Sequence, residues 1–204
     1  MLALRDARLK AGEQSLGWKV GFGSPAAFER LGTDRPLAGF MLRSGVLPDG
    51  ATVDISNWTN PALELEVAVY IGADLEIAGV SAAIELVDTT PLSTDPHEIL
   101  AANIYHRHVI LGPVDHAKRD GRGVTGRLLQ DGEEIDRSDH PTAVTGEIVG
   151  VVAQTAELLE HFGAGLSAGD VIITGSVFPP VRVGPGRYET ELPPLGTLRV
   201  DLTG

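Results

Sequence analysis

The chain has 204 residues, of which 43% are hydrophobic and 22% charged, a composition typical of one folded domain with a sizeable apolar core. Its net charge is −12 and its basic residues are scattered, which argues against binding to nucleic acid or to an anionic membrane surface. It has no cysteine, so any metal must be bound by oxygen or imidazole ligands. Since no apolar run approaches the roughly 20 residues of a membrane span and the first residues do not resemble a secretory signal, we expect a cytoplasmic location.

Helical and extended segments alternate in the first third of the chain. Residues 3–14 are rich in Ala, Leu and Arg, which favours a short helix. Residues 16–24 predict a buried strand, and residues 25–32 begin with Pro and end with Gly, as short helices often do. Residues 61–72 (PALELEVAVYIG) give the clearest strand signal, because they are β-branched and aromatic toward their end and are bounded by Pro and Gly.

Strands dominate the rest of the sequence. Residues 81–90 indicate a strand or a helix-to-strand junction, and residues 98–112 begin like a helix and end like a strand. The DG pair within residues 127–135 is typical of a hairpin. Residues 148–162 form an amphipathic helical pattern that Gly163 ends. Three further strands are expected between Gly and Pro residues, at 169–176, 179–192 and 196–202.

Many strands lie close together in sequence, and few helices are available to connect parallel strands. This pattern predicts a β-rich α+β fold, mostly antiparallel, with a few short helices. We expect a short helical segment over residues 1–15 and a single domain over residues 16–204 that carries the chemistry.

Two glutamates share one face of the clearest strand. Side chains alternate across a strand, so Glu64 and Glu66 point the same way, roughly 6–7 Å apart. That face continues with Ala68 and Tyr70, which indicates a buried rather than a solvated surface. Two carboxylates beside a buried surface repel each other and lose hydration, and a divalent cation is the simplest neutraliser. An E-x-E pair alone is also typical of a half-exposed strand, so a metal site requires a third oxygen ligand and a pocket.

The neighbouring segments occur in a characteristic order, and this set is more specific than any one motif. They are GWKVGFGS (17–24), LGTDRPLAGFML (31–42), PALELEVAVYIGADL (61–75), AAIELVDTT (82–90) and the closing region 163–202. In this order they resemble the fumarylacetoacetate hydrolase superfamily, and within it the branch of 2-oxopent-4-enoate hydratases and 4-oxalocrotonate decarboxylases. The resemblance covers about residues 16–202 and implies a mixed β-roll or sandwich fold.

The resemblance also implies a metal centre. Glu64, Glu66 and Glu85 match the carboxylate ligands of this branch, and the implied cofactor is Mg²⁺ or Mn²⁺. Asp88, three residues after Glu85, is the alternative third ligand. Such a metal acts as a Lewis acid and stabilises the enolate of a small 2-oxo acid, and Glu64 counts among the catalytic residues.

Lys19 matches a lysine that lies near the substrate in this branch. Between Trp18 and Val20, its ammonium is expected to lose hydration, which would lower its pKa toward that of a general base. The alternative is a surface lysine on an edge strand.

The substrate contacts that the resemblance implies come from three other segments. They are Asp34, Asn103, Thr174 and Gly175, the last two offering a hydroxyl and a backbone donor to a substrate carboxylate. His106 and His108 follow Asn103 and stand either as ordinary hydrogen-bonded residues or as residues of the pocket or the metal site.

We therefore expect a metal-dependent lyase, a hydratase or decarboxylase, that acts on a short 2-oxo or 2-hydroxydienoate acid. One alternative is an acylpyruvate-type C–C hydrolase or an oxaloacetate decarboxylase, although no hydrolytic His–Glu dyad is recognisable. Another, suggested by the short segment before Gly17, is a catalytically weak partner subunit of a hydratase–decarboxylase complex. A homo-oligomer is the expected assembly, with a hetero-complex with a pathway enzyme as the alternative.

Overall fold

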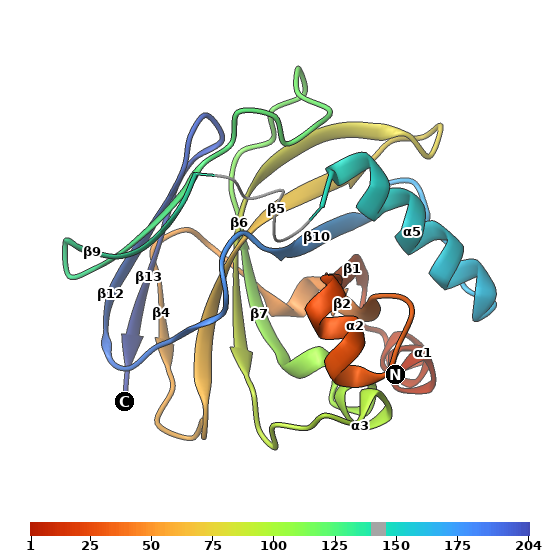
Figure 1. Ribbon diagram of the computed structural model, residues 1–204, viewed down its shortest axis with the longest axis horizontal. Coiled ribbons are helices and arrows are strands. Elements are labelled where there is room, and N and C mark those ends of the chain that lie inside the picture. The colour runs from red at the N-terminus through yellow and green to blue at the C-terminus, as the bar shows by residue number, and fades with distance from the viewer. Residues whose placement is uncertain (140–145) are drawn as a thin grey trace.

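The computed structural model describes residues 1–139 and 146–204 as two packed β-sheets with short helices at one end (Figure 1). The eight-stranded sheet has the order β2 (Leu37–Leu42), β1 (Ser15–Gly21), β10 (Val171–Ser176), β5 (Pro61–Ile71), β6 (Ile77–Asp88), β7 (His106–Leu111) and β3 (Val46–Leu47), with β11 (Val181–Arg182) also paired to β5. The five-stranded sheet has the order β4 (Ala51–Asp54), β13 (Gly196–Thr203), β12 (Gly186–Leu192), β8 (Gly126–Gln130) and β9 (Glu133–Ser138).

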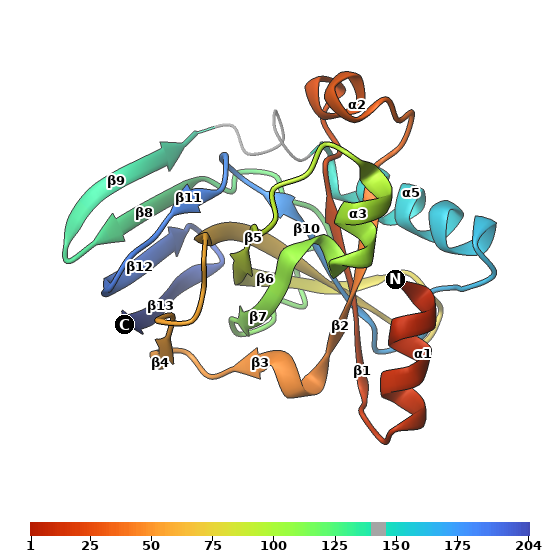
Figure 2. The same cartoon turned by 90° about the horizontal axis from the view of Figure 1, so that it is seen from below.

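The helices gather at the end of the molecule opposite the five-stranded sheet, as both views show (Figures 1 and 2). They are α1 (Leu2–Lys10), α2 (Pro25–Leu31), α3 (Pro96–Ala101) and α5 (Ile148–His161), with the short 3-10 turns η1 (Arg43–Gly45) and η2 (Asn103–Tyr105). No helix within the described ranges is long and apolar enough to cross a bilayer.

The two faces of β5 have different surroundings. Leu63, Leu65 and Val67 point into the core between the sheets, which they share with Leu128 and Val200 of the smaller sheet. The alternate residues therefore point away from the smaller sheet, and the predicted apolar continuation of that face is confirmed by Ala68 and Tyr70, which pack in a second cluster. Glu64 and Glu66 therefore lie on the face of β5 that points away from the five-stranded sheet.

Helix-capping and turn residues in the sequence lie at the helix ends and the hairpin turn that they predict. The Ser24 hydroxyl accepts the Ala27 N–H at the start of α2, and Gly32 ends that helix at φ +63°. In the β8–β9 hairpin, Asp131 and Gly132 both have positive φ, as a tight two-residue turn requires.

The structure corrects one predicted strand, resolves one ambiguous stretch and adds three parallel pairings. The strand predicted over 179–192 is two strands, β11 and β12, because Gly184 and Pro185 interrupt it. The ambiguous stretch 98–112 divides into α3, η2 and β7. Although most pairings are antiparallel as expected, β1–β10, β4–β13 and β3–β7 are parallel.

Candidate metal centre

The β5–β6 hairpin brings three carboxylates together. Its antiparallel register places Glu85 directly opposite Glu64, and Glu66 lies two residues further along the same face of β5. One ligand oxygen from each of the three lies within 4.8 Å of the others. Because cross-strand partners share a face, the register of a single hairpin assembles the whole cluster.

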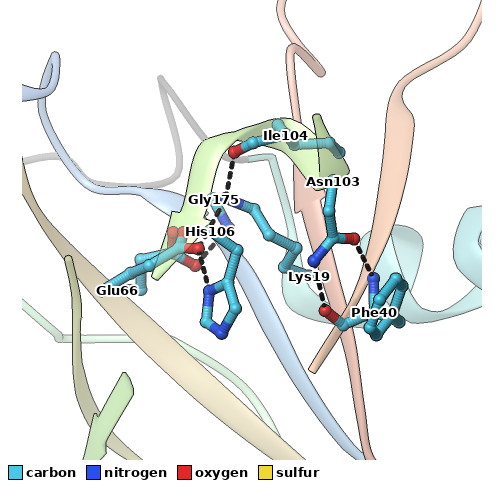
Figure 3. Close-up of polar contacts among 8 residues, drawn as sticks. Lys19, Phe40, Glu66, Asn103, Ile104, His106 and Gly175 are labelled. Carbon is cyan, nitrogen blue, oxygen red and sulfur yellow. Dashed lines mark hydrogen bonds and ion pairs between the residues drawn. The ribbon is translucent and has the colours of Figure 1, made fainter. Parts of the chain in front are cut away.

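Each of the two deeper carboxylates has one oxygen held and one oxygen without a partner. Glu66 Oε2 accepts the Gly175 backbone N–H at 2.8 Å (Figure 3). Glu85 Oε1 lies 2.6 Å from both Lys19 Nζ and His106 Nδ1. Glu66 Oε1 and Glu85 Oε2 are buried and have no hydrogen-bond partner among the described residues. Because unpaired buried carboxylate oxygens are costly, this donor set fits a hard divalent cation.

The electrostatics of the cluster favour a cation as well. Burial, with the neighbouring charge of Glu85, raises the pKa of Glu64 to about 7 and raises that of Glu66 well above its usual value. For Glu85 burial also acts to raise the pKa, but Lys19 and His106 outweigh it and hold the pKa below its usual value. A divalent cation would offset the burial and mutual repulsion that raise these pKa values, and would hold all three carboxylates in the ionised form.

Lys19 lies on β1 and is only 2% exposed. Its Nζ donates to the Ile104 carbonyl at 2.9 Å (Figure 3) and also to Glu85 Oε1 at 2.6 Å. The surface alternative is therefore wrong, and so is the expected lowering of its pKa. Burial does act to lower the pKa of Lys19, but the nearby carboxylates, Glu85 above all, outweigh it and raise that pKa.

A cavity of about 640 Å³ opens beside the cluster. Lys19 and Glu64 line it, whereas Glu66 and Glu85 are fully buried and do not. Its other walls are mostly apolar and include Val20, Phe22, Ile104, Tyr105, Phe178 and Pro179. A polar floor under apolar walls is the usual form of a small-molecule site.

Thr174 and Gly175 also line the cavity, but their donors are already engaged. The Thr174 hydroxyl donates to the Val67 carbonyl at 3.1 Å, and the Gly175 N–H donates to Glu66. Gly175 has φ +99°, a conformation that favours glycine. This pair therefore holds β5 and its carboxylate in place, instead of presenting free donors to the cavity as the sequence suggested.

Two predicted substrate contacts lie away from the cavity lining. Asp34 is exposed and pairs with its neighbour Arg35. The Asn103 side chain accepts the Phe40 N–H at 2.8 Å and donates to the Phe40 carbonyl at 2.9 Å, so it links η2 to β2 (Figure 3). Gly39 makes room for it, because a Cβ there would lie 2.9 Å from the Asn103 oxygen.

Asp88, the alternative third ligand, lies outside the cluster. It is opposite Pro61 in the hairpin, and its carboxylate accepts hydrogen bonds from the Asn60 N–H at 2.9 Å and from Arg107 at 3.2 Å. Although burial acts to raise its pKa, these donors hold the pKa of Asp88 below its usual value. Asp88 therefore has the contacts of a structural residue at the end of β6.

The substitution Asp88→Asn tests whether Asp88 or Glu85 is the third metal ligand. It removes the charge from these hydrogen bonds, so the free energy of unfolding should fall by about 1–2 kcal/mol. The rise in melting temperature on adding Mn²⁺ should persist in Asp88→Asn and disappear in Glu85→Gln. Urea unfolding and thermal melts with and without Mn²⁺ measure both quantities, and the reverse pattern of metal response would exchange the roles of the two residues.

The link between His106 and Glu85 is a feature that the sequence did not specify. His106 Nδ1 lies 2.6 Å from Glu85 Oε1, while His108 stacks on Trp58 with ring centroids 6.1 Å apart. The sequence drew attention to His106 and His108 only because they occupy alternate positions. It did not indicate that Glu85 and Trp58 are the residues they contact.

Comparisons with known proteins find relatives over nearly the whole chain, although no protein-family model matches it. The chain is 31% identical to a 2-keto-4-pentenoate hydratase of Burkholderia vietnamiensis, over 97% of this chain and 82% of that protein. It superimposes with a TM-score of 0.89 on the 4-oxalocrotonate decarboxylase of Pseudomonas putida G7 complexed with magnesium and adipate, at 25% identity and covering 98% and 82% of the two chains.

A more distant structure supports the fold alone. Fumarylpyruvate hydrolase of Pseudomonas aeruginosa, in complex with Mn²⁺ and pyruvate, has a TM-score of 0.68 at 20% identity, covering 91% of this chain and 88% of its own. The predicted fumarylacetoacetate hydrolase-like architecture is therefore confirmed.

Proposed function

The chain belongs to the family of 2-keto-4-pentenoate hydratases and 4-oxalocrotonate decarboxylases, and from this premise we propose that it is a divalent-metal-dependent lyase acting on a small 2-oxo or 2-hydroxydienoate acid. One observation carries the proposal. Three carboxylates converge beside a buried lysine at the floor of a cavity, and two of them have buried oxygens without partners.

Glu64, Glu66 and Glu85 would hold the metal, and Mg²⁺ or Mn²⁺ suits an all-carboxylate donor set. When bound, the ion supplies Lewis acidity toward the oxygens of an oxo acid. The similar 4-oxalocrotonate decarboxylase structure, which is complexed with magnesium, supports this choice.

Lys19 is proposed as the proton-transfer group of the cavity. In the metal-free chain the neighbouring carboxylates raise its pKa, and two of the N–H groups of its ammonium are taken by Glu85 and the Ile104 carbonyl. The remaining N–H is available to a ligand in the cavity that Lys19 lines. A protonated amine there stabilises negative charge on a bound acid and holds a proton at Nζ for a carbon of the substrate.

The apolar walls are proposed to receive the carbon chain of the substrate. Val20, Phe22 and Phe178 offer no hydrogen-bonding side chain, so they exclude water from the reacting carbons. The charged end of the acid would then lie at the polar floor, near Glu64 and Lys19.

Turnover of defined substrates tests the proposal. The purified chain should act on 2-oxopent-4-enoate or 4-oxalocrotonate in the presence of Mg²⁺ or Mn²⁺, as followed by ultraviolet absorbance, and EDTA should abolish the reaction. Adding back Mn²⁺ should restore it. An acylpyruvate serves as the comparison substrate for the hydrolase alternative. Turnover of the acylpyruvate alone, or activity that survives EDTA, would contradict a metal-dependent lyase.

A further inference from the structure

His106 reaches the metal cluster because of an irregularity in strand pairing. Between β6 and β7, Glu85 pairs with Val109 and Leu86 with His108, but the register then shifts so that Val87 pairs with His106. Such a β-bulge redirects the following side chain. His106 therefore shares the face of Val87 and Glu85, while His108 shares the opposite face with Leu86.

The segment before His106 is held in place by contacts from β1 and β2. Asn103, Ile104 and Tyr105 all have positive φ, between 50° and 63°. Asn103 is bonded to the backbone of Phe40, and the Ile104 carbonyl accepts the Lys19 ammonium (Figure 3). A backbone conformation that is uncommon for these residues persists only where its surroundings fix it. These contacts fix the backbone that places the His106 ring beside Glu85.

The His106 ring contacts the carboxylate but not the substrate cavity. It is 7% exposed and is absent from the lining of the larger cavity, although it lines a separate cavity of about 210 Å³ with Asp88 and Arg107. Nδ1 lies 2.6 Å from Glu85 Oε1, and a metal-binding carboxylate can only accept a hydrogen bond, so the proposed role places the ring proton on Nδ1. His106 therefore acts on the chemistry only through Glu85.

Both donors to Glu85 converge on the same oxygen. Lys19 and His106 each bond Oε1, which leaves Oε2 buried and without a partner. Lys19 also faces the cavity, so His106 is the donor with no other contact to the site. We propose that His106 is a positioning residue that fixes the Glu85 carboxylate and directs Oε2 toward the metal. This inference rests on the proposed metal centre.

Matched variants at positions 106 and 108 test the role. His106→Leu keeps much of the side-chain volume but has no donor, and it should raise the dissociation constant for Mn²⁺ by about 10- to 100-fold. His106→Asn places an amide N–H near the position of Nδ1, so it should restore affinity to within a few-fold of the unaltered chain. His108→Leu is the control, because it changes the same residue type on the same strand but on the opposite face.

Titration of free Mn²⁺ by electron paramagnetic resonance measures the binding without an activity assay. Mn²⁺ binding by the unaltered chain tests the metal centre, whereas the difference between that chain and the variants tests His106, so the two failures are distinguishable. Unchanged affinity in His106→Leu would overturn the positioning role. Equal losses in His106→Leu and His106→Asn, or an equal loss in His108→Leu, would overturn it too, since the donor would not be what matters.

Discussion

Replacing Glu64 and Glu66 together with alanine will abolish the response of this chain to magnesium or manganese. In the unaltered chain, a metal concentration about 100-fold above its dissociation constant adds about 2.7 kcal/mol to the free energy of unfolding. For a chain of this size that corresponds to a rise in melting temperature on the order of 5–10 °C. The double variant should show no such rise and no metal-dependent turnover, because only Glu85 of the cluster remains.

Thermal melts with and without Mn²⁺, together with turnover assays, check this result. Without metal, the double variant should melt no lower than the unaltered chain, since burial opposes the charged forms of both glutamates. Glu76→Ala is the matched control, because Glu76 is exposed in the turn of the same β5–β6 hairpin. A metal-induced rise that survives in the double variant would exclude these residues as ligands.

Lys19→Met should reduce turnover by about 10²- to 10⁴-fold while Mn²⁺ still binds. The loss is the contribution typical of a positioned proton-transfer group. Metal binding should persist, because removing the ammonium leaves the buried charge of Glu85 more in need of a cation. For the same reason the metal-free variant should lose about 3–5 kcal/mol of unfolding free energy, the cost of breaking a buried ion pair.

Steady-state turnover at saturating metal, with Mn²⁺ titration, separates these effects. Lys10→Met provides the control, since Lys10 is exposed at the end of α1. Full activity of Lys19→Met would remove this lysine from the mechanism. Loss of both metal binding and turnover would instead assign Lys19 to the assembly of the site.

Alternation along one strand was enough to predict the carboxylate face. Glu64 and Glu66 followed from side-chain period and from the apolar residues after them, which are local properties of the sequence. The choice between Glu85 and Asp88 depends on hairpin register, and a shift in register would present a different partner to Glu64. The resemblance favoured Glu85, and the pairing of Glu85 opposite Glu64 agrees with it.

Predictions that needed distant partners were less accurate. The pKa of Lys19 depends on Glu85, which is 66 positions away in sequence and 2.6 Å away in space. The sequence shows only the apolar neighbours Trp18 and Val20, which suggest burial and therefore a pKa shift in the wrong direction. The engagement of Asn103 with Phe40 and the bulge that redirects His106 likewise depend on how β2, β6 and β7 meet, which no local pattern encodes.

The residues of the site come from two sources: the β5–β6 hairpin supplies the carboxylates, and separate segments supply the groups around them. The three carboxylates are fixed by pairing between neighbouring strands, so their spacing tolerates changes elsewhere in the chain. Lys19, Ile104 and His106 reach them from separate segments. Substitutions in those segments therefore change the groups that orient the carboxylates and transfer protons, while the backbone positions of the three glutamates stay set by the β5–β6 pairing. This division gives evolution a simple way to vary the reaction without rebuilding the centre that supports it.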